Sequence, residues 1–102
     1  MEYNKKIQEM LPGDQIEGIY VLKTAQSRTT NSGKPFLAAV VADCSGSMEA
    51  KVWDYSGPVG AADEGTPVKV RGTVSEFRGA LQMTVERIRR VDENDQGDYA
   101  RL

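Results

Sequence analysis

Apolar and polar residues alternate along five stretches of this chain, and the alternation predicts five β-strands. The stretches cover residues 15–29, 35–43, 47–54, 66–74 and 81–86, and residues 88–91 extend the last one past a bulge. Because successive side chains of a strand point to opposite faces, each stretch has one apolar face and one mixed face. The pattern is typical of a sheet that buries one side.

Short turns join most of these stretches. Polar and glycine-containing turns at 31–34 and 44–46 make the first three strands a meander, and a turn at 77–80 joins the last two. The segment between the third and fourth strands has room for a loop or one short helix over 59–64. Gly18 inside the first strand predicts a bend or bulge. Five strands with a bent first strand favour a small closed barrel, because a sandwich needs about seven strands.

The 102 residues fit one domain. We expect an N-terminal arm over residues 1–10 with Ile7 and Met10 as its anchors, a barrel domain over 11–91, and a polar, disordered tail or linker over 92–102. The residues predicted to fill the barrel are Leu37, Val41, Met48, Val52, Val70, Val74, Leu81, Met83 and Val85.

Composition argues against catalysis within this chain. It has no histidine and one cysteine, Cys44, so the commonest general base is missing and a zinc site is nearly excluded. We expect no catalytic residue, no metal and no cofactor. A single cysteine cannot form an internal disulfide, and neither a membrane-spanning apolar run nor a signal peptide is present, so a cytoplasmic location is expected.

The mixed face of the second and third strands carries aromatic and basic residues that suit a single-stranded nucleic acid. Phe36 and Trp53 could each stack a base, and Lys51 shares the face of Trp53. The alternative is that the two rings close one end of the barrel or pack under the N-terminal arm, and that Lys51 is solvated or pairs with Glu49 or Glu76.

Further basic residues could bind phosphates. Arg28 and Lys34 flank the first turn, and Arg71 lies on the fourth strand, where we expect it to share one shallow surface with Phe36 and Trp53. Phe77 and Arg78, in the turn before the fifth strand, could clamp a bound strand; the alternative is a simple glycine-permitted turn. The net charge of −2 counts against strong nonspecific binding to polyanions.

The sequence over roughly residues 11–91 resembles the oligonucleotide-binding (OB) fold. More narrowly, it is similar to the N-terminal domain of the YhaM-type 3′–5′ exoribonucleases. The most specific parts are residues 28–30 with 33–36, 49–54, and 70–72 with 77–79. The resemblance implies an all-β, five-stranded OB-fold Greek-key barrel. It also implies a longer parent protein that carries a metal-dependent histidine- and aspartate-rich (HD) hydrolase domain, whose ligands this chain lacks.

We therefore predict an accessory module that binds single-stranded RNA or DNA, with RNA as the expected ligand, and feeds it to that HD domain. The interpretation leaves two alternatives. The same exposed face could serve protein interaction or oligomerisation, which the negative net charge favours, or the domain could be a spacer without a ligand. The oligomeric state does not follow from the sequence.

Overall fold

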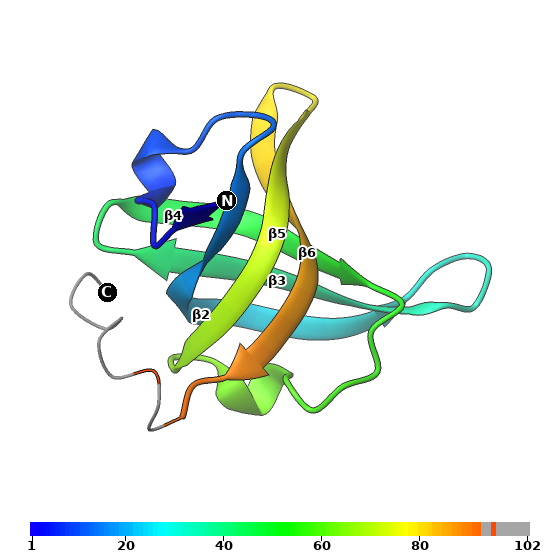
Figure 1. Cartoon of the computed structure of the whole chain (residues 1–102). Coiled ribbons are helices and arrows are strands. Elements are labelled where there is room, and N and C mark those ends of the chain that lie inside the picture. The colour runs from blue at the N-terminus through cyan, green and yellow to red at the C-terminus, as the bar shows by residue number, and fades with distance from the viewer. Residues whose placement is uncertain (93–94, 96–102) are drawn as a thin grey trace.

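Six strands and two single-turn 3-10 helices make up the part of the chain that this computed structural model describes, residues 1–92 and 95 (Figure 1). The elements are β1 (Glu2–Tyr3), η1 (Ile7–Glu9), β2 (Gln15–Thr29), β3 (Pro35–Asp43), β4 (Gly46–Trp53), η2 (Ala61–Asp63), β5 (Pro67–Phe77) and β6 (Ala80–Arg90). The five predicted strands correspond to β2–β6, and the segment between β4 and β5 holds only the short η2.

The barrel closes because β2 pairs with two different strands. Its first half runs antiparallel to β5, and its second half runs antiparallel to β3. β4 then pairs with β6 in parallel, which gives the closed order β2-β3-β4-β6-β5. The predicted all-β OB-fold barrel is thereby confirmed.

The bend of β2 is at a different residue from the one predicted. The register shifts between Leu22 and Thr24, so Lys23 is the extra residue, and it lies where β2 passes from one partner to the other. Gly18 instead admits the N-terminal arm: a Cβ at this position would lie 2.6 Å from Asn4 Oδ1. The glycine thus reflects a close approach of the arm and not a bulge.

The core matches the predicted residues closely. Eight of the nine are buried, and Leu81 is partly buried against them. The arm adds Ile7 and Met10, the β4–β5 segment adds Val59, and β2 adds Tyr20, whose hydroxyl donates to the Lys5 carbonyl at 2.6 Å. Burial raises the pKa of Tyr20 above its usual value.

One carboxylate, Asp43, fixes both the β3–β4 turn and the N-terminal arm. Asp43 accepts hydrogen bonds from the backbone N–H groups of Ile7, Ser45 and Gly46, so it caps the β3–β4 turn and holds the arm to it. Despite partial desolvation, these bonds and one from the Ser45 hydroxyl hold the pKa of Asp43 below its usual value.

The last strand continues past a bulge, as predicted. Arg71 pairs with Arg87 and Gly72 with Val85, so Glu86 is the extra residue and β6 runs on to Arg90. The tail predicted over 92–102 lies outside the described residues except for Asp92 and Asp95. No helix within the described residues is long and apolar enough to cross a membrane.

Candidate nucleic-acid interface

Three rows of side chains cross the outer face of β2, β3 and β4. The strand register sets the rows as Arg28–Phe36–Trp53, Gln26–Ala38–Lys51 and Thr24–Val40–Glu49. Their chain neighbours Leu37 and Val52 point inward and are buried. Because Ala38 has only a methyl group between the longer Gln26 and Lys51, the middle row is low, and a hollow of about 410 Å³ opens over it. We call this hollow and its rim the β3–β4 groove.

Two aromatic rings stand together at one end of the β3–β4 groove. Phe36 and Trp53 are directly opposite across β3 and β4, and their ring centroids are 4.9 Å apart. Trp53 keeps 48% of its surface exposed. The two rings, which we call the aromatic platform, together present flat apolar surface of the kind on which another planar ring can stack.

Cations lie beside this platform without carboxylate partners. Lys51 Nζ is 5.6 Å from the Trp53 ring centroid, and Arg28 is held by the Gln26 side-chain oxygen at 2.6 Å and 3.2 Å. Among the described residues neither Lys51 nor Arg28 forms an ion pair. The alternative that Lys51 pairs with Glu49 or Glu76 is therefore not what the structure has. By contrast, the cations Lys5, Lys69, Arg89 and Arg90 are all paired with carboxylates.

The opposite end of the β3–β4 groove is acidic. Glu49 lines it, two residues before Lys51 on the same face of β4. A phosphate would be repelled by this carboxylate and attracted by Lys51 and Arg28. The electrostatics therefore favour a backbone that lies toward the aromatic end.

Two hairpin tips carry three more of the predicted residues, Lys34, Phe77 and Arg78. Lys34 is exposed in the β2–β3 turn, which extends away from the barrel, and the β5–β6 turn stands at the top of the molecule (Figure 1). In that second turn Phe77 is 56% exposed, and Arg78 lies over its ring at 5.2 Å with a positive φ of 53°. Ring and cation are thus presented to solvent together.

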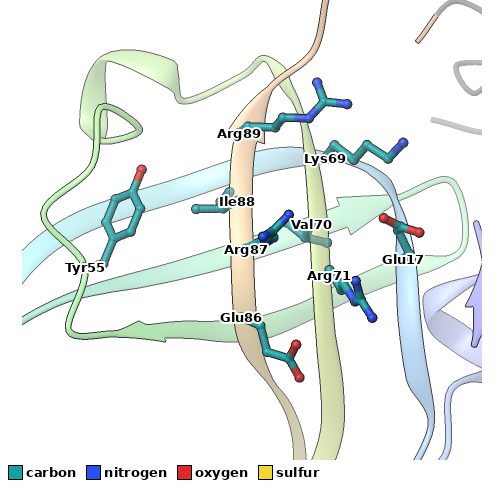
Figure 2. A pocket seen from close by; sticks show the side chains of 9 residues that line it. All are labelled: Glu17, Tyr55, Lys69, Val70, Arg71, Glu86, Arg87, Ile88 and Arg89. Atoms are coloured by element: carbon teal, nitrogen blue, oxygen red, sulfur yellow. The ribbon is translucent and has the colours of Figure 1, made fainter.

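Arg71 lies elsewhere. It is on β5, where the strand register places it opposite Glu17 of β2 and Arg87 of β6, and it lines a separate hollow (Figure 2). Arg71 was predicted to share one shallow surface with Phe36 and Trp53, and the structure places it on a different face of the barrel. Alternation showed that Arg71 points outward, but in a closed barrel outward positions of different strands face different directions.

Sequence reasoning did not name most of the residues that line the β3–β4 groove as site residues, among them Gln26, Ala38 and Glu49. The one available signal was the small residue at position 38 between bulky neighbours on the mixed face of a strand. Within the described part of the chain no three histidine, cysteine or acidic side chains are grouped to hold a metal ion.

Comparisons with known proteins agree with this architecture. The family model of the OB-fold nucleic acid binding domain (tRNA anti-codon type) matches residues 16–91. A solved structure of a replication protein A heterotrimer bound to ssDNA is similar with a TM-score of 0.62 and 21% identity, over 88% of this chain and 66% of that chain.

Two further solved structures match nearly end to end. The second OB-fold domain of replication protein A from Methanococcus maripaludis has a TM-score of 0.56 and 19% identity, over 90% of this chain and 97% of that one. An OB domain from Thermoplasma acidophilum has a TM-score of 0.58 and 15% identity, over 89% of each chain. At these identities the structures show a shared fold. The family match over residues 16–91 shows that the chain belongs to the family of OB-fold nucleic acid binding domains.

Proposed function

We propose that this chain binds single-stranded nucleic acid in the β3–β4 groove. The observation that carries the proposal is the arrangement there: two adjacent aromatic rings, one of them half exposed, beside two cations that have no carboxylate partner among the described residues. A replication protein A complex of the same fold is bound to ssDNA, which supports the assignment.

In this binding mode the bases stack and the cations hold the backbone. One or two bases would lie on Phe36 and Trp53, each worth roughly 1–3 kcal/mol. Lys51 and Arg28 would contact phosphates beside them, and Lys34, Phe77 and Arg78 would close over the strand from the two hairpin tips. Stacking and phosphate contacts accept any base, so sequence preference should be weak.

The finer part of the proposal concerns the ligand and the parent protein. The resemblance to YhaM-type exoribonucleases supports RNA as the ligand and a role as the accessory domain that delivers it to an HD hydrolase domain. RNA and DNA oligonucleotides of one sequence test the first point, because discrimination requires contact with the 2′-OH group. A clear preference for the DNA strand would contradict it.

The binding mode itself is tested by two variants that remove different contributions. Lys51→Ala should lower the slope of log affinity against log salt by about 0.7, because one phosphate contact on a single strand is lost. Trp53→Ala should weaken binding by roughly 1–3 kcal/mol at an unchanged slope, since stacking releases no counterion.

Fluorescence anisotropy with a labelled oligouridine of about 6 nucleotides, within the span of one OB fold, measures both quantities. Lys6→Gln is the control, because it removes one positive charge from an exposed residue next to η1. If neither Lys51→Ala nor Trp53→Ala differs from the wild type while both remain folded, the groove is not the binding site. A protein-interaction role for the same rings would then be favoured.

A further inference from the structure

Four basic side chains stand opposite one another on the outer face of β5 and β6. The register places Lys69 opposite Arg89 and Arg71 opposite Arg87, and all four line one hollow of about 410 Å³ (Figure 2). Like charges directly opposite across a sheet are destabilising. Two such pairs in succession therefore cost stability unless an anion lies among them.

A carboxylate already meets one of these pairs. Arg89 donates to both oxygens of Asp95, with both N–O distances at 2.9 Å, and Lys69 Nζ is 3.8 Å from the same carboxylate. The two-pronged contact from Arg89 is the geometry that a guanidinium also offers to phosphate. Hydrogen bonds from Arg89 hold the pKa of Asp95 well below its usual range, so this group stays charged.

The other pair has no such partner. Within the described residues no carboxylate oxygen lies in ion-pair distance of Arg71 or Arg87, although Glu17 stands opposite Arg71 in the register and Glu86 also lines the hollow. These two acids lower the local potential without closing on either guanidinium. The capacity to bind a further anion therefore remains at Arg71 and Arg87.

We infer that this β5–β6 face is a second phosphate-binding surface, for the backbone of a nucleic acid strand whose bases occupy the β3–β4 groove, and that Asp95 holds the place of one phosphate. The inference rests on the proposed function. β5 and β6 cross in front of β3 and β4, so the two outer faces look to opposite sides of the barrel (Figure 1). Only a strand long enough to pass around the barrel reaches both faces.

Oligonucleotide length separates the two surfaces. With an oligouridine of about 6 nucleotides, Arg71→Gln and Arg87→Gln should bind like the wild type. With one of about 30 nucleotides, longer than the span of one OB fold, each variant should lose about 0.7 of salt slope and roughly fivefold in affinity at 0.1 M salt. Lys6→Gln makes the same change in net charge, and should affect long-strand binding much less.

The outcomes separate the two ideas. Unchanged slopes of Arg71→Gln and Arg87→Gln on the long strand, or an equal effect of Lys6→Gln, would overturn the second surface even while Lys51→Ala weakens the short strand. If the wild-type protein binds neither the short nor the long oligouridine, the proposed function and the inference both fail.

Asp95 gives a test in the opposite direction. Asp95→Asn removes the internal carboxylate and should strengthen long-strand binding several-fold, because Arg89 and Lys69 become available to phosphate. Glu9→Gln, an exposed acid on η1, is the control with the same change in net charge. An effect of Asp95→Asn no larger than that of Glu9→Gln would show that Asp95 does not occupy a phosphate position.

Discussion

Gly72 shows how one missing side chain permits the barrel to close. A Cβ at this position would lie 2.5 Å from the carbonyl oxygen of Thr84 and 3.0 Å from the Val85 Cα. Both are backbone atoms of β6 at the point where Glu86 bulges, so they cannot turn aside as the end of a flexible side chain would. The close approach of β5 to β6 therefore requires glycine here.

We expect Gly72→Ala to lower the free energy of unfolding by about 1–3 kcal/mol, the usual cost of overpacking. Urea denaturation followed by Trp53 fluorescence measures it. Gly46→Ala is the matched control, since a Cβ there meets nothing within 4 Å. Equal stabilities of the two variants would show that β6 shifts without cost.

Glu49 is the residue whose charge opposes the proposed ligand. It lines the same groove as Lys51, and its removal should leave the aromatic platform unchanged. We expect Glu49→Gln to increase affinity for a short oligouridine several-fold at low salt, because one repulsive charge near the backbone is lost. Glu9→Gln again controls for net charge. Weaker binding by Glu49→Gln would mean instead that this carboxylate accepts a hydrogen bond from a base.

At the scale of elements, η2 is attached to the end of β6 by one buried carboxylate. Asp63 accepts hydrogen bonds from Arg90 Nε at 2.7 Å, from Arg90 Nη2 at 3.2 Å and from the Gly60 N–H at 3.0 Å. The Arg90 bonds, with that of Gly60, hold the pKa of Asp63 below its usual value. The ionised form therefore stabilises the fold at neutral pH, and the contribution is lost as the pH falls through the lowered pKa.

Asp63→Asn tests this linkage. The variant should melt at a lower temperature than the wild type at pH 7, and the difference should shrink as the pH is lowered from about 5 to about 2, where the wild-type carboxylate becomes protonated too. Thermal melts followed by circular dichroism over this pH series provide the measurement. Asp54→Asn, at an exposed position, is the control. A difference that stays constant down to pH 2 would contradict the assignment.

The elements were predictable because each strand buries one parity of its residues. The stretches 15–29 and 35–43 were predicted with the bounds of β2 and β3. The position of the β2 bend was not predictable, because it depends on where β5 and β3 begin to pair with it and not on a local breaker. The parallel pairing of β4 with β6 likewise joins residues more than thirty positions apart, and nothing in either strand specifies it.

At the scale of the whole molecule, the sequence pattern predicts which residues point outward, but not in which direction around the closed barrel they face. Alternation separates inward from outward residues, and it brought Arg28, Phe36, Lys51 and Trp53 to one face because their strands are sequential and antiparallel. Arg71 was assigned to that face wrongly, because its direction depends on how far around the closed barrel β5 lies. The sequence also does not predict which charged side chains form ion pairs. Within the described residues Lys69, Arg89 and Arg90 have carboxylate partners, and the cations of the β3–β4 groove have none.

Across the whole chain, the absence of histidine predicts how binding responds to pH. Histidine is the side chain whose ordinary pKa brings a change of charge between pH 5 and 8, and this sequence has none. Binding through Lys51, Arg28 and stacked rings should therefore stay constant within about twofold between pH 5.5 and 7 at fixed ionic strength.

Gln26→His is a positive control for this pH experiment, because it introduces one histidine that changes its charge in the pH range of the measurement. Position 26 lines the β3–β4 groove beside Arg28, so a protonated imidazole there would add a cation next to the backbone. Affinity of this variant for a short oligouridine should rise as the pH falls below about 6.5, while the wild type stays level. Anisotropy titrations at half-unit pH steps compare them. A tenfold rise in the wild type on acidification would show that protonation of carboxylates, and not the cations and rings of the β3–β4 groove, controls binding.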